Sequence, residues 1–578
     1  MHYSIRRPLT VDERNRLPHV SDLLAHLLFH RGIVESETAN TFLHPDYEAH
    51  THDPFLLKDA EKVADRIIKA IKNSEKTVIY SDYDTDGIPG AVALHDFFKN
   101  AGFTNFENYI PHRHDEGFGL NHEAVSKFIA DGVKLLVTID CGIADVGHVE
   151  LAQKNGIDVI ITDHHLPLNS QGESGKQVQI LPKAFAIVNP KQADCRYPEK
   201  MLCGSGVVYK LIQAILSKER FGMKEGYEKW LLDMVGIATL SDMVPLMGEN
   251  RVFAHFGLAV LRKSPRVGLT RLLSKLKVEQ RHLTEDDIGF TIGPRINAAS
   301  RMGVPMDAFR LLATRDLAEA ELLVAHLDQI NNERKGTVAA LVKEAKHHIL
   351  ERYGEKPDGV IVVGNPLWKP ALVGLAANTC AEEYSTPVFL WGRDGEGVLK
   401  GSCRSAGTVH LLNLMQATPE GTFMQFGGHE GSGGFSVALS AIHTLEEKLN
   451  VAYRSMKSEK KEEIGYADYE LSSDSVNWET YREVEKIAPF GTGNPKPVFI
   501  FKKILLADVR QFGKEKNHLE IIFTNSLGKN ISAIGFFMSP EAFPVKPEKG
   551  STISLLATME KSVFRGFPEL RLRIVDVV

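Results

Sequence analysis

The sequence predicts an α/β protein in which a parallel-sheet domain, a long connecting helix, a second α/β domain and an OB-like β-barrel follow one another. Short apolar runs alternate with helical patterns between about residues 76 and 304, and a nearly unbroken helical pattern covers 305–353. Five short strand-like runs follow residue 490. At 578 residues the chain is too long for one hydrophobic core, so several domains are expected.

Composition indicates an ordinary globular protein. Apolar residues make up 43% and charged residues 25% of the chain. Because there is no run of eighteen apolar residues and no apolar core after Met1, we expect a cytoplasmic protein without a membrane segment. The five cysteines are scattered and lack CxxC spacing, which argues against disulfides and structural zinc. The net charge of -6 does not by itself indicate nucleic-acid binding.

Residues 1–75 contain two helical patterns, at 20–29 and 58–71, which we interpret as an N-terminal cap on the sheet domain. Four apolar runs then predict the strands of that sheet, at 77–80, 134–139, 158–162 and 186–188.

Polar residues follow each predicted strand. The first strand is followed by Asp82, Asp84 and Asp86, the second by Asp140, and the third by Asp163, His164 and His165. Because ligands of an open parallel sheet bind beyond the carboxyl ends of its strands, these side chains should meet at one edge. Carboxylates this close repel one another unless a cation lies between them. A solvated acidic turn is the alternative interpretation of the first motif.

Three further segments suggest ligands, each with a structural alternative. Arg113 lies in a glycine-containing loop that suits a phosphate but also suits an ordinary turn. Asp242 lies in an almost wholly apolar stretch and needs a metal, an arginine or a helix terminus as its partner. Arg295, Asn297 and Arg301 suit phosphate contacts, although the arginines could instead pair with structural acids.

The expected second α/β domain, 354–456, carries Ser402, Arg404 and a glycine-rich segment that includes Gly428 and His429. These residues suit a phosphodiester, although a glycine loop alone is a weak signal. A charged linker, 457–463, leads to the predicted barrel at 464–578. Residues 490–578 contain 13 Lys and Arg against 8 Asp and Glu, with phenylalanines interleaved, a pattern typical of single-stranded nucleic-acid binding.

Taken in order, these motifs resemble those of the DHH phosphoesterases, and specifically of the RecJ-type exonucleases. The matching segments are Asp82-Tyr83-Asp84-Thr85-Asp86-Gly87, Thr138-Ile139-Asp140-Cys141-Gly142, Asp163-His164-His165, Ser241-Asp242-Met243, Gly293-Pro294-Arg295-Ile296-Asn297-Ala298-Ala299-Ser300-Arg301-Met302, Gly427-Gly428-His429 and Pro489-Phe490-Gly491-Thr492-Gly493-Asn494-Pro495. The resemblance covers about residues 75–578 and assigns 76–304 to the DHH domain.

The resemblance implies two Mn²⁺ or Mg²⁺ ions and degradation of single-stranded DNA from its 5′ end, in repair and recombination. It implies a monomer that works with a helicase and a single-strand-binding protein. It assigns the metal ligands to Asp82, Asp84, Asp140, His164 and Asp242, with Asp86 either a further ligand or a residue that holds the loop. Asp163 would orient an imidazole, and His165, Asp140 and Arg301 would act at the scissile phosphate. Arg113, Arg295, Asn297, Arg301, Ser402, Arg404, Gly428 and His429 would contact DNA.

The chain departs from the family pattern at Trp368-Lys369-Pro370-Ala371, where the family usually has Trp-His-Pro-Gly, and in its glycine loop. Lysine can hold a phosphate but does not transfer protons as imidazole does near neutral pH. Two alternatives remain: a phosphodiesterase of short oligonucleotides or cyclic dinucleotides, and an inactive DNA-binding scaffold. The barrel disfavours the first, and the retained acids and histidines disfavour the second.

Overall fold

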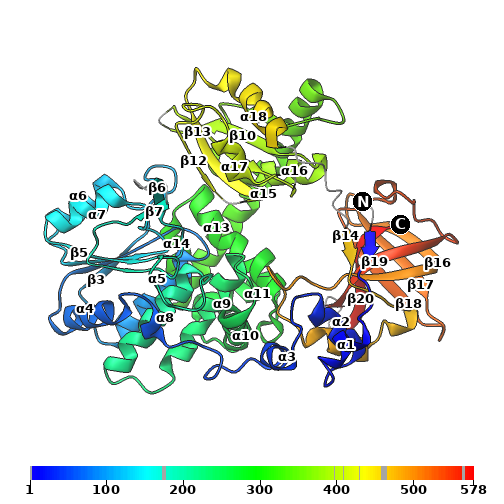
Figure 1. Ribbon diagram of the computed structural model, residues 1–578, viewed down its shortest axis with the longest axis horizontal. Helices are drawn as coiled ribbons and strands as arrows, with labels where there is room; N and C mark the ends of the chain where they lie inside the picture. Colours follow the sequence, from blue (N-terminus) through cyan, green and yellow to red (C-terminus); the bar gives the residue numbers. More distant parts are fainter. Residues whose placement is uncertain are drawn as a thin grey trace. The chain divides into compact units, whose positions relative to one another are not determined.

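The computed structural model describes residues 3–171, 177–395, 397–407, 409–428, 430–456, 465–562 and 567–578 (Figure 1). The chain divides into two compact units. The central unit contains residues 54–242 and 260–460, and the terminal unit contains residues 1–53, 243–259 and 461–578. The described part of the chain contains no helix that is both long enough and apolar enough to cross a membrane.

The central unit begins with a five-stranded parallel sheet in the order β3-β2-β4-β5-β8. Its strands are β2 (Thr77–Ser81), β3 (Phe106–Tyr109), β4 (Leu135–Ile139), β5 (Asp158–Thr162) and β8 (Ala186–Val188). The four predicted strands are confirmed. Sequence reasoning missed β3, a half-buried edge strand whose residues Phe-Glu-Asn-Tyr mix polar and aromatic side chains.

Helices cover both faces of this sheet. Helices α6 (His122–Ala130) and α7 (Val146–Lys154) share a hydrophobic core with one face of the sheet. Helices α4 (Ala60–Lys72), α5 (Gly87–Asn100) and α8 (Gly204–Lys218) pack on the other face (Figure 1). Strands β2 and β4 are buried at every residue, which explains why they read as continuous apolar runs. The hairpin β6 (Leu168–Gln171) and β7 (Gln177–Ile180) follows β5 at its carboxyl end.

A helical segment follows the sheet. Within the central unit its longer helices are α9 (Leu232–Ser241), α11 (Val267–Leu276), α13 (Gly293–Met302), α14 (Pro305–Ala313) and α15 (Leu317–Tyr353), with a short α12 (Glu285–Asp287) and a π-helix at Ile288–Ile292 before α13. The single helix expected over 305–353 is therefore two helices. Asp316 ends the break between them, because its side chain accepts a hydrogen bond from Glu319 N at 2.8 Å and so caps α15.

The second α/β domain contains a mixed sheet in the order β12-β13-β11-β10-β9. Its strands are β9 (Ile361–Gly364), β10 (Val388–Arg393), β11 (Leu399–Arg404), β12 (Gln425–Gly428) and β13 (Ser432–Val437). Helices α15 and α16 (Pro370–Tyr384) share a core with one face, and α17 (Leu411–Gln416) and α18 (Ile442–Met456) share a core with the other. The expected restart of strand and helix alternation after the long helix is thus present.

The terminal unit is built around a closed five-stranded barrel. Its strands are β16 (Phe499–Phe512), β17 (His518–Thr524), β18 (Asn530–Phe536), β19 (Thr552–Ser562) and β20 (Glu569–Val577), with β16 pairing β19 to close the ring. The predicted OB-like barrel is confirmed. Two-residue β15 (Tyr469–Glu470) adds to β16, and α19 (Trp478–Glu485) precedes the barrel.

The N-terminal residues also belong to the terminal unit, together with the segment that begins α10 (Gly248–Leu261). Helices α1 (Val11–Asn15), α2 (Asp22–Phe29) and α3 (Ser36–Leu43) follow β1 (Tyr3–Ile5), which pairs with β14 (Gly465–Ala467). Apolar side chains of α2 and α3 share one core with the barrel interior. The expected cap therefore does not end near residue 75: residues 1–53 pack with the barrel, and α4 belongs to the parallel sheet.

Candidate metal centre and nucleic-acid interface

The loop after β2 fixes the first acids of the site. Asp84 Oδ1 accepts hydrogen bonds from Asp86 N at 2.7 Å and Gly87 N at 3.1 Å, at the start of α5. A Cβ at Gly87 would lie 2.6 Å from the carbonyl oxygen of Asp82, so only glycine allows this tight turn. The helix N-terminus favours the negative charge held there.

Asp86 links this loop to α8. Its carboxylate accepts hydrogen bonds from Gly204 N at 2.6 Å and Ser205 N at 2.7 Å, and its carbonyl accepts one from Ser205 Oγ at 2.6 Å. This geometry gives Asp86 the role of holding the loop. Because Asp86 Oδ2 also lies 3.7 Å from His164 Nε2, its role as a further metal ligand stays a prediction.

Asp140 is turned into the same space by an unusual backbone conformation directly after β4. Its φ of 60° is left-handed, which costs a residue other than glycine about 1–2 kcal/mol. A hydrogen bond from Asp140 N to Thr162 O at 2.9 Å holds this turn. Asp140 Oδ1 then lies 3.1 Å from His164 Nε2.

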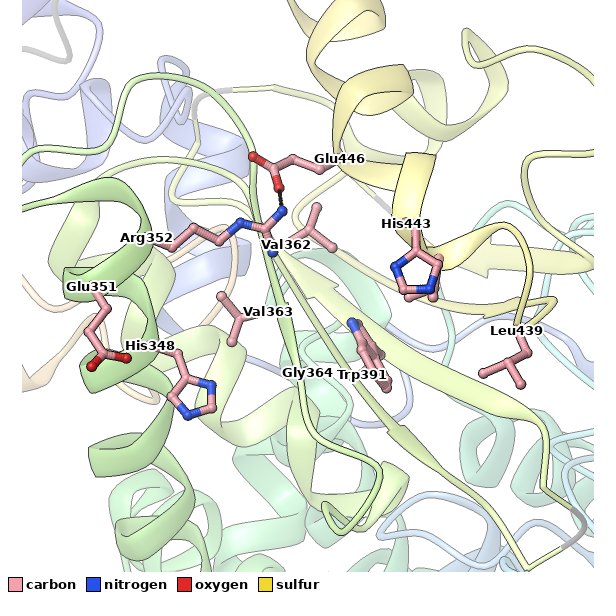
Figure 2. Close-up of a pocket in the computed structure, with 11 residues that line it drawn as sticks. His348, Glu351, Arg352, Val362, Val363, Gly364, Trp391, Leu439, His443 and Glu446 are labelled. Atoms are coloured by element: carbon pink, nitrogen blue, oxygen red, sulfur yellow. Dashed lines mark hydrogen bonds and ion pairs between the residues drawn. The ribbon is translucent and has the colours of Figure 1, made fainter.

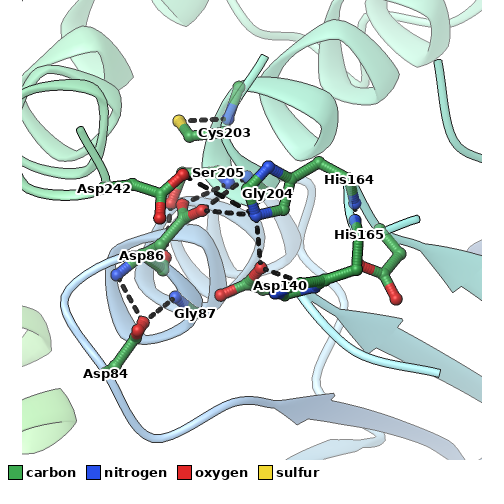
Figure 3. A network of polar contacts seen from close by, with 12 residues as sticks. Asp84, Asp86, Gly87, Asp140, His164, His165, Cys203, Gly204, Ser205 and Asp242 are labelled. Atoms are coloured by element: carbon green, nitrogen blue, oxygen red, sulfur yellow. Dashed lines mark hydrogen bonds and ion pairs between the residues drawn. The ribbon is translucent and has the colours of Figure 1, made fainter. Parts of the chain in front are cut away.

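His164 connects the acids contributed by different elements. Its Nε2 lies 3.7 Å from Asp242 Oδ2, at the end of α9, as well as 3.1 Å from Asp140 Oδ1 (Figure 3). Three groups of possible ligand atoms, each within 4.8 Å of one another, overlap here: Asp82, Asp84 and Asp140; Asp86, His164 and Asp242; and Asp140, His164 and His165. The predicted ligands are therefore together, and the first two groups suggest two neighbouring cation positions.

The electrostatics of this cluster fit a multivalent cation. The pKa of Asp82 is raised mainly by burial and next by the charge of Asp84. The pKa of Asp140 is raised mainly by burial and next by the charge of Asp86. Burial and neighbouring acids also raise the pKa of Asp86 to about 6 and that of Asp242 to about 8. Asp82 Oδ1 is buried and accepts no hydrogen bond from the described residues. Oxygen ligands with an imidazole, and no thiolate among them, suit Mn²⁺ or Mg²⁺.

The two histidines differ in charge state. Burial and the neighbouring His165 lower the pKa of His164 to about 3, which keeps this imidazole neutral and able to ligate a metal. The pKa of His165 is raised to about 9. Burial alone would lower it, but the 2.8 Å hydrogen bond from Nδ1 to Asp163 Oδ1 and the charges of the surrounding acids outweigh burial. Asp163 Oδ2 also accepts a hydrogen bond from Ile143 N at 3.0 Å, which fixes the carboxylate in place. Asp163 can therefore orient the His165 ring, the role expected for it.

Guanidinium groups gather near the acids. The pKa of Arg301 is lowered to about 9, mainly by burial and next by the positive charges of three other arginines, Arg113, Arg334 and Arg404. Within the described part of the chain none of these four arginines forms an ion pair with a carboxylate, although Arg301 Nη1 donates to Ala371 O at 2.7 Å. Unpaired arginines crowded together are expected where an anion binds, and guanidinium groups suit phosphate oxygens.

Two predicted DNA contacts have structural partners instead. Arg295 donates to Asp328 Oδ1 from Nε at 3.1 Å and from Nη2 at 2.9 Å, which is the structural-acid alternative. Asn297 Oδ1 accepts Thr85 N at 3.1 Å and so fastens α13 to the acid-bearing loop. Neither geometry favours a direct phosphate contact.

The remaining predicted contacts come from the second α/β domain. Ser402 and Arg404 lie on β11 against α16, because a Cβ at Gly374 would lie 3.2 Å from Ser402 Oγ and 3.0 Å from Arg404 Nη2. Gly428 ends the exposed strand β12 with a φ of 147°. His429 lies outside the described residues, so its predicted role stays a prediction.

Sequence reasoning missed Lys191, which follows β8 and faces the acids. Burial lowers its pKa, while the charges of Asp242, Asp163 and Asp140 oppose that change. A single lysine after Asn-Pro carries no sequence signal that separates it from a surface lysine. Only the carboxyl-end position of its strand could have indicated it.

The barrel carries an aromatic cluster of its own in the terminal unit. His518 packs against Phe512 at 5.2 Å, Phe536 at 5.2 Å and Phe537 at 4.8 Å between ring centroids. Phe537 is 80% exposed, and the Arg573 guanidinium lies 4.0 Å above the Phe536 ring. Phe501 is buried instead, and Phe564 and Arg565 lie outside the described residues. The exposed Phe537 ring and the cation over the neighbouring Phe536 ring suit base stacking and backbone binding.

A separate cavity of about 520 Å³ lies in the second α/β domain (Figure 2). Residues of α15, β9, β10 and the start of α18 line it, and an ion pair between Arg352 and Glu446 spans its upper end in the figure. Of the predicted site residues that the structure describes, none lines this cavity.

Comparison with known proteins places these features in one family. Residues 76–239 match the model of the DHH family, N-terminal domain, and residues 467–576 match the RecJ OB domain. The single-stranded-DNA-specific exonuclease RecJ of Bacillus subtilis is 34% identical over 583 residues, covering 100% of this chain and 70% of that protein. The chain belongs to the RecJ family. The Haemophilus influenzae RecJ is 30% identical over 540 residues, covering 91% of each chain.

Solved structures share this fold. The fold matches the crystal structure of Thermus thermophilus RecJ in complex with Mn²⁺ with a TM-score of 0.80 and 24% identity, covering 100% of this chain and 79% of that one. A crystal structure of exonuclease RecJ bound to manganese matches with a TM-score of 0.57 and 28% identity, covering 69% and 96% of the two chains.

Proposed function

We propose that this RecJ-family chain is a divalent-metal-dependent exonuclease that hydrolyses single-stranded DNA to nucleotides from its 5′ end, in DNA repair and recombination. The convergence of Asp82, Asp84, Asp140, His164 and Asp242 carries this proposal. Relatives named as single-stranded-DNA-specific exonucleases, with at least 30% identity, support the substrate class.

The cofactor proposed is a pair of Mn²⁺ or Mg²⁺ ions. Asp82, Asp84 and Asp140 would hold one, and His164 and Asp242, with Asp86, would hold the other. Solved RecJ structures that contain Mn²⁺ or Mg²⁺ support this choice. Such ions, when bound, neutralise charge on a scissile phosphate and lower the pKa of water.

The chain's own residues position the substrate around this centre. The Arg301 and Arg404 guanidinium groups would bind phosphate oxygens, because they are buried and have no carboxylate partner among the described residues. His165, held by Asp163 as an imidazolium, would donate a hydrogen bond to the scissile phosphate. Asp140 would act at the reacting phosphate, because its carboxylate groups with Asp82 and Asp84 on one side and with His164 and His165 on the other.

Strand binding is assigned to the barrel, where Phe537 is exposed and Arg573 lies over Phe536. Stacking on such rings does not depend on base identity, which suits an exonuclease that must accept any sequence. A phosphodiesterase of short oligonucleotides or cyclic dinucleotides would not need this surface. We therefore favour a long single strand as substrate.

The setting of the reaction follows from the substrate. A DNA exonuclease acts where chromosomal DNA is, which for a bacterial RecJ-type protein is the cytoplasm, and the five buried free cysteines suit a reducing compartment. A helicase and a single-strand-binding protein are the proposed partners, because a duplex must be opened before this enzyme can act. We propose that the chain acts as a monomer, since one chain supplies every predicted ligand.

Incubation with Mn²⁺ and labelled oligonucleotides of several lengths tests the proposal. We expect mononucleotides from long single strands, protection by a blocked 5′ end but not by a blocked 3′ end, and no turnover by Asp140→Asn. Cleavage restricted to very short substrates would instead assign the second activity. Binding of DNA without any cleavage would assign the scaffold.

A further inference from the structure

We propose that the Lys191 ammonium binds a non-bridging oxygen of the scissile phosphate and stabilises the charge that grows there during hydrolysis. The inference rests on the proposed nuclease function, which it deepens by adding a residue to the phosphate site. Lys191 follows β8, at the same edge of the sheet as the acids and histidines.

The backbone of Lys191 is fastened to the segment that carries His165. Asn189 Nδ2 donates to the His165 carbonyl at 2.9 Å, and Asn189 Oδ1 accepts Lys191 N at 2.8 Å. On the other side, Gln179 Nε2 donates to Lys191 O at 3.0 Å. The start of the Lys191 side chain is therefore fixed relative to His165, and a fixed donor loses less entropy when it binds.

The ammonium lies within electrostatic range of three acids but forms an ion pair with none of the described carboxylates. Its charge acts on Asp140, Asp163 and Asp242, and it lowers the pKa of Asp242. Lys191 is half-buried, yet among the described residues its Nζ lies within ion-pair distance of no carboxylate. A structural lysine in such surroundings would be expected to pair directly, because a desolvated charge is costly when it is unpaired.

The free cation and the acids favour one arrangement of substrate. A phosphodiester placed between the acid cluster and Lys191 would have its non-bridging oxygens facing the ammonium. During hydrolysis water forms a new P–O bond and loses a proton, one P–O ester bond breaks, and the leaving oxygen takes up a proton. Lys191 takes no part in either proton transfer. It only balances negative charge on the phosphoryl oxygens.

A simpler role must be separated from this one: Lys191 as a counter-ion that partly neutralises the acids. Both roles predict that removing the cation leaves Mn²⁺ affinity unchanged or increases it, since a positive charge near the ions disfavours them. Only phosphate binding predicts a slower chemical step. The rate therefore distinguishes the two roles, and the Mn²⁺ affinity shows whether a slow rate instead results from a damaged metal site.

The experiment compares full-length wild type, Lys191→Met, Lys191→Arg and the control Lys183→Met, an exposed lysine in the same β7–β8 region. Single-turnover cleavage, with enzyme in excess over DNA and at a saturating concentration, gives the chemical rate. Mn²⁺ titration followed by electron paramagnetic resonance gives metal affinity without any cleavage. We expect Lys191→Met to slow cleavage about 100- to 1,000-fold, as for loss of one donor to a developing oxyanion. Lys191→Arg should recover at least tenfold of that loss, and the control should match wild type.

A Lys191→Met rate within threefold of wild type would overturn the inference. A slow rate accompanied by tenfold weaker Mn²⁺ binding would also overturn it, because the effect would then act through the metal site. If Lys191→Met does not fold, as judged by calorimetry, Lys191→Gln is subjected to the same two measurements. A wild-type protein that cleaves nothing would refute the proposed function itself, which separates that failure from failure of this inference.

Discussion

Asp242→Asn should stabilise the metal-free protein while abolishing activity. The pKa of Asp242 is raised from 3.8 to about 8 by burial and by Asp86 and Asp84. A rise of about four pH units, at about 1.36 kcal/mol each, corresponds to roughly 5–6 kcal/mol of unfavourable charge in the folded state. Asparagine removes this charge but also its attraction for His165 and Lys191. We therefore expect a net gain of about 2–4 kcal/mol near pH 8.

The gain should depend on pH in a defined direction. A carboxyl group with a raised pKa is protonated in the folded state but ionised in the unfolded state between about pH 4 and pH 8. Its favourable contribution is complete below pH 4 and is lost as the pH rises through about 8. The two histidines largely cancel, because the pKa of His164 is lowered to about 3 and that of His165 is raised to about 9. Wild type without metal should thus lose stability from pH 5 to pH 8. The variant should lose less, because it lacks the contribution of Asp242 but keeps those of Asp82, Asp86 and Asp140.

Calorimetry in a chelator at several pH values tests this reasoning. The transition of the central unit is the one that Mn²⁺ shifts upward in wild type, since a ligand that binds only the folded state stabilises it. Asp131→Asn, at an exposed acid whose ion pair with Lys127 is screened by solvent, is the control and should leave the melting temperature close to that of wild type. An Asp242→Asn protein that is less stable than wild type at pH 8 would refute the account of a repulsive, metal-requiring cluster.

Three further predictions concern positioning, phosphate contact and strand binding. Asn297→Ala should slow single-turnover cleavage about tenfold while costing about 1 kcal/mol of stability, because it frees the acid-bearing loop; a pure loss of DNA affinity would contradict this. Arg301→Met should lower kcat/KM about 30- to 100-fold with an unchanged melting temperature, because Arg301 contacts phosphate. Arg295→Met should instead destabilise the fold by about 3 kcal/mol, because it leaves Asp328 unpaired. The reverse pattern would contradict both assignments. Phe537→Ala should weaken binding of long single strands by about 1–3 kcal/mol in fluorescence anisotropy and leave cleavage of short oligonucleotides unchanged.

The parallel sheet was predictable because its strands are buried on both faces. Strands β2 and β4 have no solvated face, so they appear as apolar runs, and the polar residues after them mark the active edge. Strand β3 escaped prediction because its four residues are only half-buried and place two adjacent polar residues between two aromatic ones. The placement of residues 1–53 could not be predicted, since helical periodicity shows that an apolar face exists but not which core it joins.

The acids of the site were predictable from spacing, whereas the partners of the arginines were not. Arg295 and Arg301 lie six residues apart in one motif, yet Arg295 pairs with Asp328 from α15 and Arg301 has no carboxylate partner among the described residues. That difference depends on which helix packs against each side chain, and no local pattern encodes it. Lys191 was missed for the same reason, because the acids whose charges act on it belong to segments far from it in the sequence.

Anomalous diffraction from crystals of the protein soaked in Mn²⁺ tests the central claim most directly. The account predicts two neighbouring peaks, one bounded by Asp82, Asp84 and Asp140 and the other by His164 and Asp242 with Asp86 beside them. Peaks at other side chains, or an absence of bound Mn²⁺ at these acids under saturating conditions, would contradict it.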